Sequence, residues 1–297
     1  MRSHRRRAQV GGPPPPGAGS YDADVTEFEL AKLDWHDFTD EEFHLCPPIF
    51  ALGGDGAMMD IGFQNLSRLM ASGKPIKVVV LDTQVYSNTG GQACTSGFTG
   101  QVSDMATYGE GNHGKTEVRK ELSLLAMAHR GTFVVQSSQA LPAHLLRGTI
   151  RGLNSRRPAV FVLHSPCMPE HIVEASAAAR QAKLALDARA YPILIFDPDK
   201  GDDFGARIEL DGNPSPTKTW SRYKLDYVDD EGQAASLELP MTIADWAATE
   251  GRFKKHFSKL QDGVEAVHYG DYLNLSKDQR EGITPFIYTL GQDDRLG

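Results

Sequence analysis

Two glycine-rich segments contain residue types that could bind a metal ion and a phosphorylated ligand. The first reads GGDG over residues 53–56, and the second reads LDTQVYSNTGGQ over residues 81–92. Glycines between a strand and a helix let backbone amides approach a phosphate at the helix N-terminus. An aspartate among these glycines would repel a phosphate unless a divalent cation lay between the two charges. Asp55 is therefore predicted to bind Mg²⁺, which would bridge to a diphosphate.

Further oxygen ligands for Mg²⁺ are available in the second segment. The hydroxyl of Thr83 and the backbone carbonyl of Val85 follow Asp55 by 28 and 30 residues. One strand–helix–strand unit spans such a distance and brings its two loops to the same edge of a parallel sheet. Taken alone, GDG is equally consistent with an ordinary strand-to-helix turn. The two segments together favour a metal–diphosphate site.

Alternating strand and helix patterns are expected to position these loops. Apolar runs typical of buried strands occupy residues 49–52, 76–81, 132–136, 159–163 and 192–196. Helical spacing predicts helices over residues 58–72, 117–130, 141–154 and 174–190. The alternation predicts an α/β fold with a mostly parallel sheet and helices on both faces. Ligands bind such sheets at the carboxyl ends of the strands, so residues 54–57, 82–92 and 165–167 are expected at one rim.

The chain is predicted to have three parts. Residues 1–20 are rich in arginine and then in proline and glycine, without the apolar stretch of a signal peptide or the amphipathic spacing of a transit peptide. This composition predicts a disordered leader or a misplaced gene start. Residues 21–198 are predicted to form the α/β domain. Residues 199–297 are predicted to be an irregular C-terminal extension with one helix over residues 243–260.

Composition excludes several classes of protein. The 297 residues include 31 Lys and Arg against 39 Asp and Glu, and the net charge of −8 argues against a nucleic-acid-binding protein. No window approaches the roughly 20 apolar residues of a membrane span, so we expect no integral membrane protein. Three cysteines without a CxxC pair argue against a disulfide scaffold or a zinc ribbon. The predicted compartment is a reducing cytoplasm.

The segment from Gly53 to Gln92 resembles the thiamin-diphosphate-binding motif of the pyruvate:ferredoxin (flavodoxin) oxidoreductases. The resemblance continues through residues 115–127, the SPC motif at residues 165–167 and residues 244–257. It implies that the α/β domain has the thiamin-diphosphate-binding fold. It also implies that Mg²⁺ is held by Asp55, by Thr83 and by the carbonyl of Val85. The implied cofactor-binding residues are Gly54, Asp55, Gly56, Ala57, Thr83 and Asn88.

By the same resemblance, Asn88 lies against the reactive region of thiamin diphosphate and is the predicted catalytic residue. Simpler thiamin enzymes carry paired asparagines near this point, whereas Asn88 is followed by Thr89. This difference favours the oxidoreductase branch over decarboxylases and carboligases. The alternative for Asn88 is a side chain that only shapes a turn by bonding nearby backbone.

Cys167 of the SPC motif corresponds to a cysteine that in the family binds a four-iron, four-sulfur cluster. The other three ligands of that cluster have no counterparts here, and one cysteine cannot hold it. Cys167 is therefore predicted to bind a cluster only in an assembled enzyme with ligands from another chain, or else to be a relic or loop thiol. We interpret Cys46 as an inert thiol and Cys94 as an ordinary loop cysteine, with a thiol that faces substrate as the alternative.

The resemblance implies oxidative decarboxylation of a 2-oxoacid, pyruvate, to acetyl-CoA, with electrons passed through an iron–sulfur cluster to ferredoxin or flavodoxin. It covers only the C-terminal part of a much longer polypeptide. We therefore expect the chain to be inactive without partner chains that supply pyrimidine-binding and cluster-binding domains. Its small-molecule partners would be pyruvate and coenzyme A. The alternatives are a non-oxidative thiamin-dependent 2-oxoacid decarboxylase and a non-catalytic remnant.

Overall fold

The computed structural model describes residues 27–28, 31–291 and 293–296, and it divides into two units between Ile49 and Phe50. The predicted leader over residues 1–20 lies outside the described residues. In the first unit, the 3₁₀-helix η1 (Trp35–Asp37) and the helix α2 (Asp40–Leu45) each begin with a capping box. The side chains of Asp34 and Thr39 accept hydrogen bonds from backbone N–H groups in the first turn, which have no partner within the helix. These bonds explain why the helices begin there.

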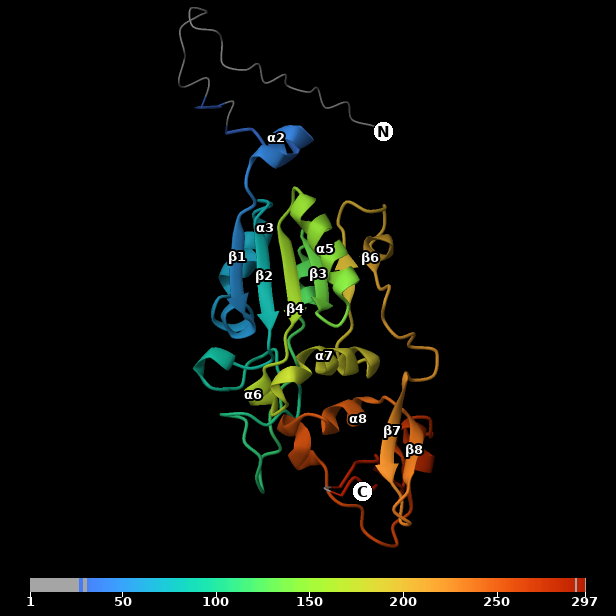
Figure 1. The fold of residues 1–297 in the computed structure, drawn as a ribbon. Coiled ribbons are helices and arrows are strands. Elements are labelled where there is room, and N and C mark those ends of the chain that lie inside the picture. Colours follow the sequence, from blue (N-terminus) through green and yellow to red (C-terminus); the bar gives the residue numbers. More distant parts are fainter. Residues whose placement is uncertain (1–26, 29–30, 292, 297) are drawn as a thin grey trace, which may run out of the picture. The chain divides into compact units, whose positions relative to one another are not determined.

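A six-stranded sheet lies at the centre of the second unit (Figure 1). Its spatial order is β1 (Phe50–Gly54), β2 (Lys77–Asp82), β4 (Ala159–His164), β3 (Phe133–Ser138), β5 (Leu194–Phe196) and β6 (Ile208–Glu209). The first four strands are parallel, whereas β5 runs antiparallel to β3 and β6 antiparallel to β5. The predicted mostly parallel sheet is confirmed.

The reversed direction of β5 follows from where the chain travels after β4. Figure 1 shows α6 (Met168–His171) and α7 (Ala178–Asp187) beyond the carboxyl edge of the parallel strands. A parallel connection needs a crossover that returns over a face of the sheet. Because α7 stays at the carboxyl edge, the chain enters β5 from that edge and runs back.

Helices cover both faces of the sheet, as predicted. On one face, α3 (Phe63–Ala71) and α4 (Leu122–Ala128) supply buried side chains to a core with the valines of β2, β3 and β4. On the other face, α5 (Pro142–Asn154) packs closely through two glycines. A Cβ added at Gly148 would lie 2.8 Å from Val135, and one at Gly152 would lie 2.5 Å from Phe161.

Three predicted helices are shorter or divided in the structure. The helix expected over residues 58–72 begins as the π-helix η2 (Gly56–Ile61) and continues as α3, because the amide of Gly62 donates to the carbonyl of Ala57, five residues back. The helix expected from residue 117 begins at Leu122, because Arg119 is held by Asp82 and the carbonyl of Ser96. The helix expected over residues 174–190 is the 3₁₀-helix η4 (Ala175–Ala177) followed by α7.

The C-terminal part is more ordered than the irregular extension that we expected. The hairpin of β7 (Arg222–Val228) and β8 (Ala234–Pro240) is followed by α8 (Ile243–Ala248) and the 3₁₀-helix η6 (Gly251–His256). The expectation of a single helix over residues 243–260 is therefore wrong. The chain breaks at Glu250, whose buried carboxylate binds Arg252. The remaining elements are β9 (Ala266–His268), α9 (Tyr269–Tyr272), β10 (Thr284–Phe286) and the 3₁₀-helices η3 (Ser87–Thr89), η5 (Gly205–Arg207) and η7 (Asp278–Arg280).

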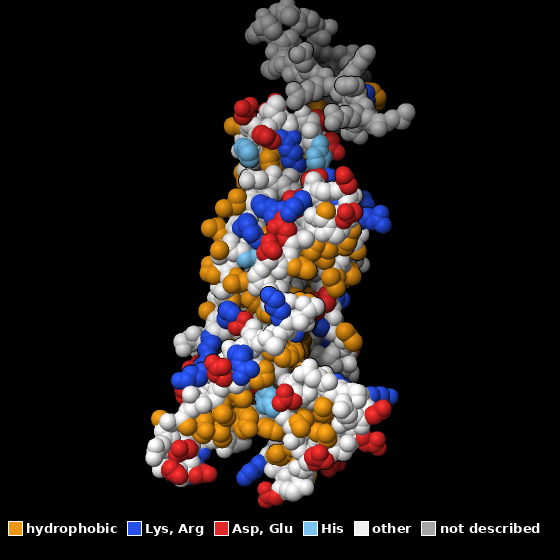
Figure 2. Space-filling view, turned by 90° about the vertical axis from the view of Figure 1, so that its right-hand side faces the viewer, with side chains coloured by type: hydrophobic (Ala, Val, Ile, Leu, Met, Phe, Trp, Pro, Cys, Tyr) orange, Lys and Arg blue, Asp and Glu red, His pale blue; other side chains and the backbone are white. Residues whose placement is uncertain are grey.

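A second core joins this C-terminal part to α7. The side chains of Trp246 and Phe253 are buried in one cluster with Ala185 and Tyr191. Beside β6, oppositely charged side chains lie next to one another on the surface (Figure 2), and Arg151 bridges Asp197 and Glu209 there. Within the described part of the chain, no helix is long and apolar enough to cross a membrane.

Candidate functional site

The three predicted metal ligands converge where β1 and β2 end. Asp55 follows β1, and Thr83 and Val85 follow β2, its parallel neighbour. The hydroxyl oxygen Oγ1 of Thr83 lies 3.2 Å from Oδ1 of Asp55 and 3.0 Å from the carbonyl oxygen of Val85. Because Mg²⁺–oxygen distances are about 2.0–2.1 Å, adjacent oxygens of an octahedral site lie about 3 Å apart. The separations of the Thr83 hydroxyl from the carboxylate and from the carbonyl therefore match those between neighbouring ligands of one such ion.

The carboxylate of Asp55 is buried and accepts several hydrogen bonds from the protein. The backbone amides of Gly56 and Gln84 donate to it at 2.9 and 2.5 Å, and the hydroxyl of Ser96 donates at 2.5 Å. Burial raises the pKa of Asp55, and the nearby charge of Asp82 raises it further. A cation beside Asp55 would offset both effects.

The second acidic residue at this rim, Asp82, is already paired. Its Oδ2 atom receives the guanidinium of Arg119 at 2.5 Å and the hydroxyl of Tyr191 at 3.0 Å. Asp82 therefore positions the chain between β2 and α4. Its charge is compensated by the protein, in contrast to that of Asp55.

The two glycines of the GDG segment face different surroundings. A Cβ at Gly56 would lie 2.3 Å from the ring of Tyr86, so only glycine fits there. A Cβ at Gly54 would meet nothing within 4 Å. The surface beside Gly54 is thus open, and the neighbouring Ala57 is exposed in the first turn of η2. A phosphorylated ligand could approach the helix start at this point.

Asn88 lies in η3, in the same loop as Thr83 and Val85. Its side chain is exposed and makes no hydrogen bond to the described residues. The side-chain-to-backbone bond that the turn-shaping alternative requires is therefore missing from the described structure. The turn after Asn88 is closed instead by Gly90 and Gly91, whose φ angles are +98° and +99°. Glycine adopts this left-handed conformation without strain.

The three cysteines are free and lie in different surroundings. Cys46 is exposed in the first unit, and Cys167 is half-buried at the start of α6. Cys94 is buried, with its Sγ 2.7 Å from Ser96 Oγ, and burial together with Asp55 raises the pKa of its thiol to about 12. Cys94 is therefore buried next to the carboxylate of Asp55. Among the described residues, no three His, Cys, Asp or Glu side chains are grouped to hold a metal ion, so cluster binding by Cys167 stays a prediction.

Several residues around this site were not predicted from the sequence. Ser96 binds Asp55 from 41 residues away, and His171 reaches the carbonyl of Thr83 from 88 residues away. Glu250 and Arg252 are buried behind His171. The sequence contains no motif that marks these positions, because each contact depends on how distant segments fold together.

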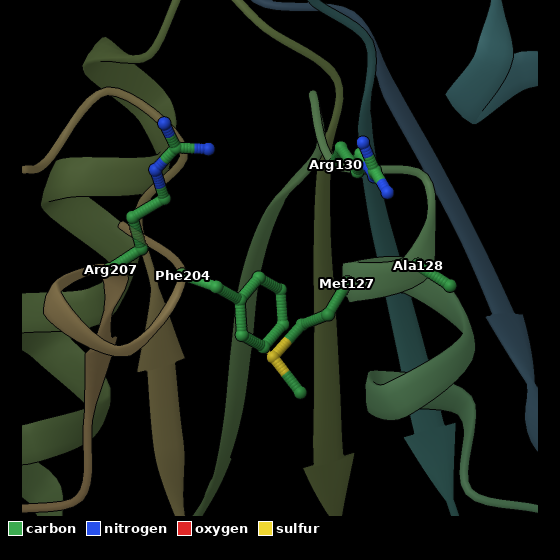
Figure 3. A pocket seen from close by; sticks show the side chains of 5 residues that line it. All are labelled: Met127, Ala128, Arg130, Phe204 and Arg207. Carbon is green, nitrogen blue, oxygen red and sulfur yellow. The ribbon is translucent and has the colours of Figure 1, made fainter. Parts of the chain in front are cut away.

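A separate open hollow lies at the amino ends of the strands, away from Asp55 (Figure 3). It has a volume of about 560 Å³ and is lined by Met127, Ala128, Arg130, Phe204 and Arg207. In Figure 3 the side chains of Phe204 and Met127 point toward one another between the two arginines. The hollow contains none of the predicted site residues.

Residues 44–163 match the family described as "Thiamine pyrophosphate enzyme, C-terminal TPP binding domain". Thiamine pyrophosphate is another name for thiamin diphosphate. The matched segment contains Asp55, Thr83, Val85 and Asn88. It ends in β4.

The chain is also similar to several oxidoreductases. It is 34% identical over 151 residues to the pyruvate:ferredoxin oxidoreductase of Moorella thermoacetica, which is 50% of this chain and 12% of that protein. It is 31% identical over 207 residues to the pyruvate-flavodoxin oxidoreductase of Rhodospirillum rubrum, which is 69% of this chain and 15% of that protein. To the pyruvate synthase subunit PorB of Pyrococcus horikoshii it is 26% identical over 219 residues, 74% of this chain and 62% of that subunit.

The chain thus matches only a small part of the two long oxidoreductases. The resemblance predicted from the two glycine-rich segments is confirmed. Residues 44–163 match the thiamine pyrophosphate enzyme C-terminal domain, and the chain is similar to a part of the pyruvate:ferredoxin and pyruvate-flavodoxin oxidoreductases.

Proposed function

We propose that this chain binds Mg²⁺ and thiamin diphosphate as one part of a 2-oxoacid:ferredoxin or flavodoxin oxidoreductase. The proposed reaction is the oxidative decarboxylation of pyruvate to acetyl-CoA. The observation that carries this proposal is the position of Thr83 Oγ1, 3.2 Å from Asp55 Oδ1 and 3.0 Å from the Val85 carbonyl oxygen. These oxygens lie in a segment that matches a thiamin-diphosphate-binding family.

The residues of this chain would bind and orient the cofactor. Asp55, Thr83 and Val85 would hold Mg²⁺, and the open surface beside Gly54 and Ala57 would receive the diphosphate. Bound thiamin diphosphate supplies the carbanion chemistry that cleaves the 2-oxoacid. The exposed amide of Asn88 would donate a hydrogen bond to the negative charge that develops during this reaction.

An exposed apolar strip supports the proposal that the chain works with a partner. On one face of β1 and β2, Phe50, Leu52 and Leu81 are 53%, 69% and 39% exposed. Apolar strips of this kind commonly mark interaction surfaces. The partners that we propose are a pyrimidine-binding domain, a cluster-binding domain with further ligands for the cluster of Cys167, and ferredoxin or flavodoxin. Three free thiols are in keeping with a reducing cytoplasm.

Thermal unfolding with and without ligands tests the binding part of this proposal. We expect Mg²⁺ and thiamin diphosphate together to raise the midpoint of unfolding, since a ligand at 100 times its Kd stabilises a fold by about 2.7 kcal/mol. Asp55→Ala should lose this shift because the diphosphate then approaches without a bridging cation. Asp187→Ala, which removes a surface carboxylate paired with Lys183, is the matched control. An undiminished shift in Asp55→Ala would refute the assignment.

A further inference from the structure

The turn that carries two of the proposed metal ligands has a strained backbone. Gln84 lies between Thr83 and Val85 and has a φ angle of +63°. Residues other than glycine rarely adopt this left-handed conformation, and they keep it only where surrounding groups hold them. Rotation of this residue would move Thr83 Oγ1 and the Val85 carbonyl relative to each other and to Asp55.

Both carbonyl groups at the start of the turn are held by buried side chains. Nε2 of His171 lies 3.0 Å from the carbonyl oxygen of Thr83, and Nε2 of Gln101 donates to the carbonyl oxygen of Gln84 at 2.9 Å. Because a carbonyl only accepts hydrogen bonds, Nε2 of His171 must carry a hydrogen. The two bonds fix the peptide groups on either side of the strained residue.

Behind the turn, Arg252 links Gln101 to Glu250, which lies beside His171. Arg252 donates to Oε1 of Gln101 at 2.9 Å and to Oε2 of Glu250 at 2.6 Å. Nδ1 of His171 lies 3.6 Å from the same Oε2 atom. The four side chains thus form a ring that is hydrogen-bonded from Gln101 through Arg252 to Glu250, whereas Nδ1 of His171 lies beside Glu250 without a hydrogen bond. The side chains of the ring are at most 2% exposed.

The segment that carries Glu250 and Arg252 is itself fixed in place. The guanidinium of Arg252 lies over the ring of Phe253 at 4.8 Å, and a Cβ at Gly251 would lie 2.4 Å from Ile172, directly after α6. A buried ion pair is weak evidence for a stabilising role, because apolar residues of similar shape often stabilise a fold as well or better. A role in holding the neighbouring turn in its conformation explains this ion pair more directly.

We infer that His171, Gln101, Glu250 and Arg252 are positioning residues that hold the turn at Gln84 in the conformation required by the Mg²⁺ site. The inference rests on the proposed function, since it assigns a purpose to this ring at the site of Asp55. It gives the C-terminal segment a part in cofactor binding, although the family match to the cofactor-binding domain ends at residue 163. The ring acts through Thr83 and Val85 and does not itself touch the metal.

Direct titration with Mg²⁺ tests this inference without any measurement of activity. The full chain is titrated calorimetrically with Mg²⁺ in the presence of excess thiamin diphosphate, below its unfolding temperature, and a titration of thiamin diphosphate alone is subtracted. His171→Leu removes the donor to Thr83, and the Kd for Mg²⁺ should rise by about 10-fold or more, as for other residues that orient metal ligands. His171→Gln retains an N–H donor at similar reach and should restore most of the affinity.

Two further variants separate positioning from general stability. Gln101→Met keeps the shape of the side chain but loses the bond to the Gln84 carbonyl, so it should weaken Mg²⁺ binding even if His171→Leu does not fold. Arg151→Leu breaks two ion pairs beside β6 and should lower the unfolding temperature while leaving Mg²⁺ affinity unchanged.

Hydrogen exchange of the amides in residues 83–87 of the metal-free chain gives a second measurement. Exchange should accelerate in His171→Leu and Gln101→Met but not in Arg151→Leu. If wild type binds Mg²⁺ and both ring variants bind it equally well, the positioning role is wrong and the proposed function stands. If wild type binds no Mg²⁺, the proposed function and the positioning role are both wrong, whatever the exchange rates.

Discussion

In the metal-free protein, burial of the Asp55 carboxylate in its charged form lowers the free energy of unfolding. Burial and the charge of Asp82 raise its pKa above the value it has in the unfolded chain. Between the two pKa values the folded protein holds a proton that the unfolded chain has released, so stability falls as pH rises through this window. A bound cation would reverse this effect by favouring the charged form.

We expect this pH dependence to disappear in Asp55→Asn. In the absence of Mg²⁺, the unfolding temperature of wild type relative to Asp55→Asn should fall as the pH is raised from the ordinary carboxylate pKa toward neutrality. Taking the difference removes any constant effect of changed hydrogen bonds. Thermal unfolding with a chelator across this range is the measurement. A difference that grows in favour of wild type with rising pH would contradict the raised pKa.

A second prediction at the scale of single residues concerns Asn88. Asn88→Ala should bind thiamin diphosphate nearly normally but lose turnover by roughly 10²–10³-fold in the assembled enzyme, as expected when a positioned hydrogen-bond donor is removed. Cofactor affinity and single-turnover decarboxylation are measured on the same sample, with the exposed Asn65 of α3 changed to alanine as the control. Weak binding with a normal chemical step would instead assign Asn88 a role in shaping the turn.

At the scale of elements, the start of η2 combines tight packing with an open surface. Gly56 is pressed against Tyr86, whose hydroxyl donates to Asp60 within the same helix. Gly54, two residues earlier, has free space where a side chain would lie. The π-helical turn that begins here is a wide turn of the kind often found at functional sites.

Alanine substitutions at these two glycines should have opposite effects on stability and binding. Gly56→Ala forces the Tyr86 ring away and should lower the unfolding temperature of the ligand-free chain. Gly54→Ala should leave that temperature nearly unchanged but weaken the binding of Mg²⁺ and thiamin diphosphate, because its methyl group occupies the surface proposed for the diphosphate. Calorimetry on both variants measures the unfolding temperature and the affinity for Mg²⁺ and thiamin diphosphate. Normal cofactor affinity in Gly54→Ala would place the diphosphate elsewhere.

At the scale of the whole molecule, the described residues include the proposed cofactor site but not the other groups that the proposed reaction needs. Cys167 has no further cysteine ligands grouped with it among the described residues. The apolar strip at Phe50, Leu52 and Leu81 remains exposed. Both features lead us to expect activity only in an assembly.

We therefore expect the purified chain neither to reduce ferredoxin nor to hold an iron–sulfur cluster. Iron, sulfide and thiamin are to be measured after anaerobic expression, alone and together with a chain that supplies the pyrimidine-binding domain and the CxxC pair. A brown preparation of the chain alone, with about four irons per chain, would contradict this expectation. Cluster assembly only in the co-expressed sample would support it.

The sequence by itself determined the sheet and the meeting of Asp55 with Thr83 and Val85. Both follow from local information, because apolar runs mark buried strands and adjacent parallel strands bring their following loops to one rim. The register of β1 with β2 then places Gly54 beside Leu81, so the two loops begin side by side. A site built from consecutive strand ends can therefore be predicted from spacing.

Only the tertiary structure decided the surroundings of that site. Gln101 and Arg252 are hydrogen-bonded across 151 residues, whereas the sequence pattern only placed Arg252 in a helix over residues 243–260. Charged residues are usually exposed, so no local pattern predicts a buried arginine whose partner Gln101 comes from the loop after β2. The direction of β5 was undecided for the same reason, since it depends on α7 remaining at the carboxyl edge. Burial of a polar group depends on what distant segments bring to it, and that is settled only when the chain has folded.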